Sequence, residues 1–399
     1  MIPFNSAGKW GFCNAGRDIV IACEYDAVQC FSSDPCRPQD EPLALVRSGI
    51  LPQEWRHGMI NPQGEVRIPL DYANLEPFAG GFAKMRRHGK SLYGFIDPLG
   101  RLLTHHEFET AQSFSEGLAY VSRPPRKRVQ EHGFLDSSGD IVLSGRLLFD
   151  DARPFQQGLA VVTHYAARGY FYSYLKPDGT FLTVRKPGQT SSNLNWFCSA
   201  SPFQADRALV CGELTGFAII DREGMVVADL GFAFDAAYPA SEGLVRVVKG
   251  RDTGFLDTQG NEVIPCILDY ARVRDFCCGL AAFQESCDSP WGFFNRQLDV
   301  VVPPRYTEVG DFSEGLATVK RGDLYGFVDT RGQEVVGSRY LFLSTFENGL
   351  ALAGRAGMRF YIDSNGVEYQ GEAQVRSPRP GLEAPRSDSS DEPSRIRPD

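Results

Sequence analysis

The chain has 399 residues, of which 42% are hydrophobic and 23% are charged, and its net charge is −9. This composition is typical of a globular protein. The acidic balance argues against a dedicated nucleic-acid-binding protein, which would carry a basic face. No apolar run is long enough for a transmembrane helix, and the first residues lack the basic and apolar regions of a secretory signal. We therefore expect a cytoplasmic protein with no membrane segment.

A short element recurs along the chain, in which a glycine and an aromatic residue are followed by Asp-x-x-Gly. Its clearest copies begin at Tyr93, His132, Gly254 and Tyr325. Looser copies begin at Trp10, His57, Thr215 and Trp291, a weaker one covers residues 170–179, and an incomplete one covers residues 359–366.

A second motif, Phe-x-x-Gly-Leu-Ala, precedes the next copy of the first. It occupies residues 114–119, 155–160, 276–281, 312–317 and 346–351. Two motifs in fixed order, at a period of about 33 to 47 residues, indicate a tandem repeat architecture. We expect about nine units and a terminal half-unit over residues 1–371.

The chemistry of one unit predicts short strands joined by tight turns. The Asp of Asp-x-x-Gly accepts hydrogen bonds from the backbone of its own turn, and the Gly supplies a positive φ. Pro69, Pro265 and Pro303 are expected to end the strand that follows, since proline cannot donate to a ladder. Each unit then has about three strands, which are too few to form a hydrophobic core alone. Neighbouring units must therefore share a continuous core.

Two all-β architectures satisfy this pattern. We expect an open β-solenoid or superhelical array, because about nine units of about three strands differ from the four to eight four-stranded blades typical of a propeller. The alternative is a closed propeller-like ring, because the chain begins and ends on the same half-unit, as it would in a ring closed by its termini.

The repeated elements resemble those of the bacterial WG-repeat (KWG-repeat) proteins, whose units begin Lys-Trp-Gly-Phe and continue into Asp-x-x-Gly. The full signature is present at residues 9–12, and Trp-Gly-Phe is present at residues 291–293, whereas other residues replace Trp elsewhere. The resemblance covers roughly residues 8–366. It implies a β-rich repeat fold and no common catalytic residue.

Three stretches depart from the repeat. Residues 34–55 and 180–202 lengthen two units, and we expect loops there. Residues 372–399 contain few apolar side chains and balanced charges, which predicts a disordered polyampholyte tail.

Motifs for catalysis or metal binding are absent from the sequence. No phosphate-binding loop, dinucleotide fingerprint, nucleophile elbow or zinc-protease helix occurs, so we expect no enzyme activity, no cofactor and no metal. His105 and His106 are adjacent and would face opposite sides of a strand, so we do not expect them to bind one metal ion together. A zinc site from Cys23, Cys30 and Cys36 would lack the usual spacing, so we expect reduced thiols.

Basic residues recur in the turn before the Gly-aromatic strand. The expected binding residues are Arg86, Arg87, Arg126, Lys127 and Arg128, with similar residues at Lys84, Lys90, Arg123, Lys249, Arg251, Lys320 and Arg321. Units stacked in register would align them into a basic edge that attracts a protein with an acidic surface. The alternative is that they only keep a strand edge soluble.

The expected function is therefore that of a non-enzymatic scaffold for protein–protein interaction. One alternative is a carbohydrate or cell-wall binder that uses exposed tryptophans among Trp10, Trp55, Trp196 and Trp291. The other is a glycosidase-like enzyme with two facing carboxylates. Glu116, Glu242 and Glu314 occupy one turn position of different units, which favours a role in turn formation instead.

Overall fold

The computed structural model describes residues 1–125, 131–144, 149–166, 169–188 and 196–371. These residues form nine small antiparallel sheets in tandem, which confirms the expected all-β class. The expected tail at residues 372–399 lies outside the described residues. Among the described residues, the one helical element is η1 (Pro52–Glu54), and no helix is long and apolar enough to cross a membrane.

The first five sheets lie within residues 2–231. The first sheet contains β1 (Ile2–Ser6), β2 (Lys9–Cys13) and β3 (Ile19–Tyr25). The second contains β4 (Ala27–Val28), β5 (Ala44–Ser48), β6 (Arg56–Ile60), β7 (Val66–Leu75), β8 (Ala83–Arg87), β9 (Tyr93–Ile96) and β10 (Leu102–Phe108). The next three contain β11 (Thr110–Ala111), β12 (Ala119–Ser122), β13 (His132–Leu135) and β14 (Ile141–Val142); β15 (Asp151–Ala152), β16 (Ala160–Ala166) and β17 (Gly169–Leu175); and β18 (Ser199–Ala200), β19 (Arg207–Gly212), β20 (Gly216–Asp221) and β21 (Val226–Gly231).

The remaining four sheets have four strands each. They are β22 (Ala236–Ala237), β23 (Leu244–Lys249), β24 (Asp252–Asp257) and β25 (Glu262–Leu268); β26 (Arg272–Val273), β27 (Leu280–Gln284), β28 (Trp291–Asn295) and β29 (Val300–Tyr306); β30 (Glu308–Val309), β31 (Leu316–Arg321), β32 (Leu324–Asp329) and β33 (Glu334–Tyr340); and β34 (Phe342–Leu343), β35 (Leu350–Arg355), β36 (Met358–Asp363) and β37 (Glu368–Tyr369).

A complete unit has four strands, so the expectation of about three strands was wrong. The missed strand is the first and has only two residues, as in β30, which pairs with β31. The seven-stranded sheet combines two units, β4–β7 and β8–β10, so the nine sheets of the described residues hold ten units. We number these in chain order, from unit 1 (β1–β3) to unit 10 (β34–β37).

The glycine after the aromatic residue allows two strands to approach closely. A Cβ on Gly292 of β28 would lie 2.6 Å from the carbonyl oxygen of Val302 of β29, and one on Gly326 would overlap the carbonyl oxygen of Val336. The register between these strands shifts at the same place, at a β-bulge. Only glycine leaves room for the bulged strand.

The prolines do not end their strands, contrary to the sequence-based prediction. Pro69, Pro265 and Pro303 lie inside β7, β25 and β29. Each lies where the pairing register shifts. A bulge leaves a backbone position out of the ladder, so the missing N–H of proline is tolerated there.

The hydrophobic core lies between consecutive units. Trp291, Phe293 and Tyr306 of unit 8 pack in one buried cluster with Phe312 and Val319 of unit 9. Each unit thus supplies one wall of two successive clusters, which explains why a single unit cannot be stable alone.

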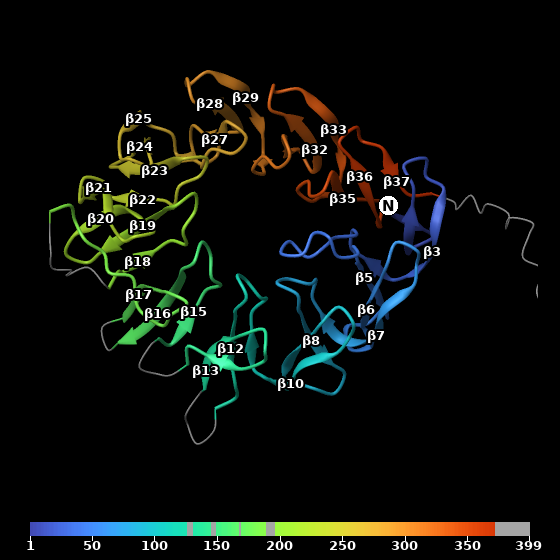
Figure 1. The fold of residues 1–399 in the computed structure, drawn as a ribbon. Coiled ribbons are helices and arrows are strands. Elements are labelled where there is room, and N and C mark those ends of the chain that lie inside the picture. The colour runs from blue at the N-terminus through green and yellow to red at the C-terminus, as the bar shows by residue number, and fades with distance from the viewer. Residues whose placement is uncertain (126–130, 145–148, 167–168, 189–195, 372–399) are drawn as a thin grey trace, which may run out of the picture.

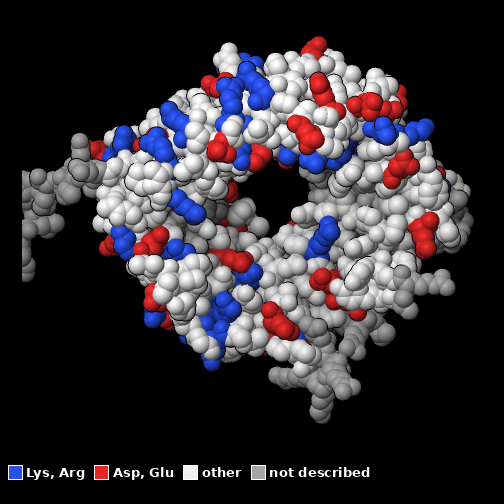
Figure 2. All heavy atoms as spheres, turned by 180° about the vertical axis from the view of Figure 1, so that it is seen from behind, with Lys and Arg blue, Asp and Glu red and all other residues white. Residues whose placement is uncertain are grey.

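The first and last units are in contact. In Figure 1 the sheets follow one another around a central opening, with the N terminus beside β36 and β37, and Figure 2 shows the opening from behind. Phe4 and Cys13 of unit 1 share a buried cluster with Leu350 and Tyr369 of unit 10.

Candidate functional site

The expected basic edge begins in β8, whose last two residues are Arg86 and Arg87. The guanidinium of Arg86 lies 5.4 Å from the ring centre of Tyr93, and that of Arg87 lies 5.7 Å from the ring centre of Tyr72. Arg87 is exposed and Arg86 is half-buried. Neither has a carboxylate partner among the described residues. The other three expected members, Arg126, Lys127 and Arg128, lie outside the described residues.

Several basic residues of the same pattern are held by carboxylates. Lys84 lies 2.6 Å from Glu76, Arg123 lies 2.9 Å from both Glu107 and Glu131, and Lys320 lies 2.6 Å from Glu308. These acids lie in or next to strands that are nearby in sequence, so the positive charge is balanced locally. At these positions the structure does not present an unpaired basic stripe.

The face shown in Figure 2 also carries a mixture of positive and negative side chains. Lysine and arginine side chains alternate there with aspartate and glutamate around the central opening. Patches of one sign are small on this face.

The glutamates considered for a glycosidase-like site bind backbone amides. The carboxylate of Glu116 accepts a hydrogen bond from the N–H of Gly158 at 2.8 Å, and that of Glu242 accepts one from Gly279 at 3.0 Å. Glu314 accepts one from Gly349 at 2.8 Å and one from Asn348 at 2.8 Å. In each case the donor belongs to the same turn of the next unit, so these carboxylates link consecutive units.

The residue before each glutamate makes a second link. The hydroxyl of Ser313 donates to the carbonyl oxygen of Phe346 at 2.8 Å, and that of Ser241 donates to the carbonyl oxygen of Phe276 at 2.7 Å. The phenylalanine carbonyl lies in the turn of the next unit. The Phe-Ser-Glu-Gly-Leu motif therefore joins units as well as turning the chain.

The tryptophans do not share one environment. Trp10 and Trp291 are buried in the core, at 8% and 6% exposed. Trp55 is half-buried beneath the guanidinium of Arg47, at 4.2 Å from its ring centre. Trp196 is 56% exposed and packs edge-on against His164. Two of the four rings are thus unavailable to a sugar.

The cysteines are free thiols. Burial raises the pKa of Cys30 to about 11, and the Sγ of Cys23 lies against the carbonyl oxygen of Phe4. Cys36 is exposed. No group of three His, Cys, Asp or Glu side chains placed to hold a metal is found within the part of the chain that the structure describes.

His106 acts as a local structural residue. Its Nε2 accepts a hydrogen bond from the backbone N–H of Arg87 at 3.2 Å. Burial, together with Arg87 and Lys90 nearby, lowers the pKa of His106. The imidazole is therefore neutral at pH 7 and suited to this acceptor role.

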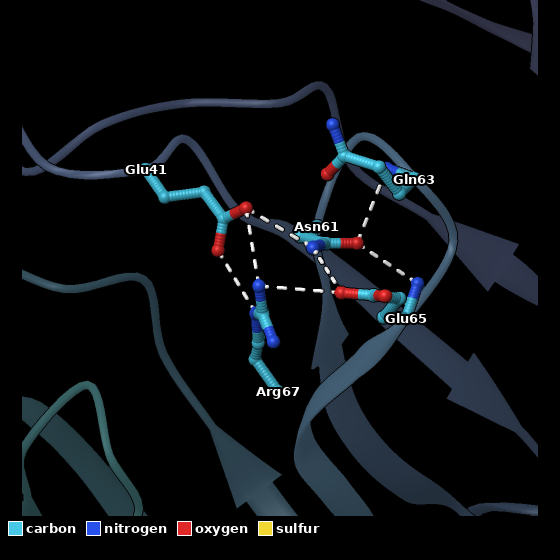
Figure 3. Close-up of polar contacts among 5 residues, drawn as sticks. All are labelled: Glu41, Asn61, Gln63, Glu65 and Arg67. Carbon is cyan, nitrogen blue, oxygen red and sulfur yellow. Dashed lines mark hydrogen bonds and ion pairs between the residues drawn. The ribbon is translucent and has the colours of Figure 1, made fainter.

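A polar cluster in unit 2 was not expected from the sequence. Asn61 occupies the place of the turn aspartate, is 1% exposed, and donates to Glu41 at 3.0 Å and Glu65 at 2.9 Å (Figure 3). Arg67 completes the cluster, with its Nε 2.9 Å from Glu41, and this hydrogen bond lowers the pKa of Glu41. The cluster fastens the lengthened segment to unit 2, and the exchange of Asp for Asn was its one sequence signal.

The segment expected as a loop at residues 34–55 therefore has defined structure. It contains β5, and the buried carboxylate of Asp34 accepts hydrogen bonds from the N–H groups of Gly80 and Gly81 in unit 3. Its function in the structure is to clamp units 2 and 3 together.

Two grooves are lined by charged residues, of which only Asp97 and Arg251 belong to a repeated motif. One, of about 710 Å³, is lined by three arginines and three acids, whose charges balance: Arg37, Arg67, Arg101, Asp40, Glu41 and Asp97. The other, of about 950 Å³, lies between units 7 and 8 and is lined by Arg246, Arg251, Arg272 and Arg274. The second groove has an excess of positive charge.

Comparison with solved structures gives weak likenesses. BamB from Moraxella catarrhalis is 12% identical with a TM-score of 0.36, over 74% of this chain and 94% of that one. The uncharacterized protein lmo1340 from Listeria monocytogenes EGD-e is 10% identical with a TM-score of 0.30, over 68% of this chain and 97% of that one. At these scores the likenesses carry no inference about fold or function.

A search of the curated proteins gave no match. The family model described as WG containing repeat does match, in seven segments: residues 10–47, 58–90, 93–123, 133–164, 254–286, 291–325 and 325–353. These segments together cover more than half of the chain, and each begins on a Gly-aromatic strand and runs into the next unit. The chain belongs to the family of WG-containing repeat proteins.

Proposed function

We propose that this protein is a non-enzymatic scaffold that binds a partner protein with an acidic surface, and that its ten units form a closed ring. The observation that carries the proposal is that the repeated polar residues of the turn bind the backbone of the next unit. Glu116, Glu242 and Glu314 hold the next unit's backbone, so the motif that repeats most regularly builds the array. What varies between units is the surface, which is the part available for recognition.

Closure of the ring is supported by polar and aromatic contacts between the ends. Asn5 bridges to Gln370, and the guanidinium of Arg17 donates to the carbonyl oxygen of Gln370 at 2.8 Å. The rings of Trp10 and Tyr361 meet edge-on at 5.7 Å. A ring covers the apolar face that each terminal unit would otherwise leave exposed, which an open array must cap by other means.

Small-angle X-ray scattering of the whole chain tests this closure. A closed ring gives a compact particle with a central hole, whereas an open superhelix gives a longer maximum dimension. The variant Trp10→Ala weakens the contact between the ends and is expected to lengthen the particle. An elongated profile for the unmodified chain would contradict the ring.

The proposed contact with the acidic partner is the basic edge at Arg86 and Arg87. Both guanidinium groups lie against tyrosine rings, which fixes their position at little further entropic cost on binding. Neither is neutralised by a carboxylate of the described residues. Such groups steer an acidic partner and respond to salt.

The test is capture of the partner from the native host by the tagged chain, followed by mass spectrometry. A stoichiometric protein that is released by salt is expected. The variant Arg86→Glu with Arg87→Glu should lose that protein, whereas Arg153→Glu with Arg359→Glu, which changes the net charge equally on exposed arginines of units 5 and 10, should retain it. Equal capture by all three chains would show that the basic edge is not the contact with the partner. The absence of any stoichiometric protein would contradict the scaffold function.

A further inference from the structure

The groove between units 7 and 8 combines arginines with aromatic rings. It has a volume of about 950 Å³ and lies open to solvent, with Tyr238, Tyr270 and Trp291 among its lining residues. Its arginines come from both units, with Arg246 and Arg251 in unit 7 and Arg272 and Arg274 in unit 8. The groove therefore exists only because the two units are joined.

Two of the four arginines form the walls. The guanidinium of Arg246 lies 3.6 Å from the ring centre of Tyr238 and 2.7 Å from Asp275. That of Arg274 lies 4.8 Å from the ring centre of Trp291 and donates to the carbonyl oxygen of Val309 at 3.0 Å. These stacked and bonded groups give a rigid, partly positive surface.

The other two arginines are exposed and have no carboxylate partner within the described residues. Arg251 lies in the turn between β23 and β24, and Arg272 begins β26. An unpaired arginine on a rigid wall is a ready donor for a carboxylate, which it can bind in a bidentate manner.

Comparison with unit 9 shows that Arg272 is a departure from a balanced arrangement. Arg272 pairs in register with Gln284, whereas at the same position of unit 9 Glu308 pairs with Lys320. The unit 9 pair forms an ion pair at 2.6 Å. In unit 8 the acid is replaced by a base and the base by an amide, which leaves the positive charge of Arg272 free to meet a ligand.

The remaining charges of the groove restrict the ligand. Asp269 and Glu285 line it as well, and the chain as a whole carries a net charge of −9. A nucleic acid, with one charge per phosphate, would place charges beside these acids along its whole length, whereas a polypeptide can place uncharged residues there. The groove is open to solvent and lined by tyrosine rings, which suits an extended polypeptide better than a small anion.

We infer that this groove binds an acidic segment of a partner polypeptide, whose carboxylates pair with Arg251 and Arg272 while its neighbouring side chains pack on Tyr238 and Tyr270. This assignment rests on the proposed scaffold function and places a second contact away from Arg86 and Arg87.

Fluorescence anisotropy tests the assignment with the full chain. The probe is a short fluorescein-labelled peptide of alternating glutamate and tyrosine, and a glutamine–tyrosine peptide is the neutral control. The acidic peptide is expected to bind at low ionic strength, and Arg251→Glu with Arg272→Glu is expected to weaken it by about tenfold or more. The milder Arg251→Gln with Arg272→Gln should weaken it less, and Arg153→Glu with Arg359→Glu should leave it unchanged.

Equal binding by the unmodified chain and the Arg251→Glu, Arg272→Glu variant overturns the assignment of the groove as the peptide-binding site. A loss confined to Arg86→Glu with Arg87→Glu also overturns it, and leaves the proposed scaffold and its basic edge in place. A single-stranded oligonucleotide that competes as well as the acidic peptide overturns the choice of a polypeptide. The absence of binding to the unmodified chain overturns this inference alone, because capture of the natural partner tests the scaffold separately.

Discussion

Units 8 and 9 have the same backbone plan and opposite electrostatics. Both place a glycine against a bulged strand, and both bury the phenylalanine that opens the turn, Phe276 and Phe312. In unit 9, Glu308 holds Lys320 and accepts the hydroxyl of Tyr325 at 2.9 Å, whereas unit 8 has Arg272 with Gln284 at the matching positions. Core positions are therefore constrained by packing, and the charged positions of the short strand are free to take up a function.

The turns of the two units differ as well. In unit 9 the carboxylate of Asp329 accepts the N–H groups of Arg331 and Gln333, at 3.0 and 2.8 Å. In unit 8 the side-chain oxygen of Asn295 accepts those of Gln297 and Asp299, both at 2.9 Å. The hydrogen bonds are alike and the charge is not, so the same turn can be built with or without a titrating group.

The shared glycine is the feature whose loss should cost most. We expect Gly292→Ala and Gly326→Ala each to destabilise the protein by about 3 kcal/mol, because the new methyl group would meet the backbone of β29 or β33. Thermal unfolding with hydrogen exchange in the affected unit measures this. Gly337→Ala is the matched control, since its Cβ would have open space. A small effect in one unit and a large effect in the other would break the comparison.

The link between turns should come next. Glu314→Ala removes the acceptor of two N–H groups in unit 10 and is expected to cost about 1 kcal/mol, because the carboxylate is exposed and water replaces part of the bond. Faster amide exchange at Asn348 and Gly349 would show where the loss occurs. Glu223→Ala, an exposed carboxylate in the turn between β20 and β21, should leave those amides unchanged.

The two turns should respond differently to acid. Burial alone would raise the pKa of Asp329, but the hydrogen bonds from Gln333 and the charge of Arg331 outweigh it and lower the pKa. A lowered folded-state pKa means that Asp329 stabilises the protein above its unfolded value of 3.8 and that this contribution is lost as the pH falls through the folded value. Asp329→Asn should therefore reduce the loss of stability between neutral and acidic pH.

Denaturant unfolding at several pH values measures this difference. The reciprocal change, Asn295→Asp, should add the same acid sensitivity to unit 8. Identical pH profiles for all three proteins would mean that the charge of the turn residue does not matter.

The exposed residues of the two short first strands should have the smallest effect. Arg272→Gln removes the exposed cation of unit 8 and keeps Gln284, which is 5% exposed and donates to the carbonyl oxygens of Cys287 and Ser289. It is expected to change stability by less than about 0.5 kcal/mol, as surface substitutions usually do. In unit 9 the Glu308–Lys320 ion pair is expected to contribute about 0.5 kcal/mol, which a double-mutant cycle on thermal unfolding with Glu308→Gln and Lys320→Gln measures. Arg272→Gln removes one of the two unpaired arginines of the groove, so it should weaken binding of the acidic peptide while stability stays nearly the same.

Local motifs predicted the features that depend on neighbouring residues in the chain. The Asp-x-x-Gly turns form as expected, with Asp257 accepting the N–H groups of Gln259 and Asn261. The two-residue first strand was missed because β30 has too few residues to carry a pattern, and its existence depends on pairing with β31. The prolines were misread because a bulge is a property of two strands and not of one.

The charged surface shows the same division. The recurrence of Lys and Arg before the Gly-aromatic strand is visible in the sequence, but the acids that hold Lys84 and Lys320 come from other strands. The arginines of the groove lie on two units, and only Arg251 belongs to the basic pattern of the turns. Only the joining of units 7 and 8 brings them together.

The sequence by itself therefore determined the all-β class, the repeat, the turns and the family, because each follows from residues close together in the chain. The tertiary structure decided the fourth strand, the bulges, the meeting of units 1 and 10, and which basic groups stay unpaired. These depend on contacts between strands and units that lie far apart in the chain, where the partner of a side chain is set by packing and not by sequence distance.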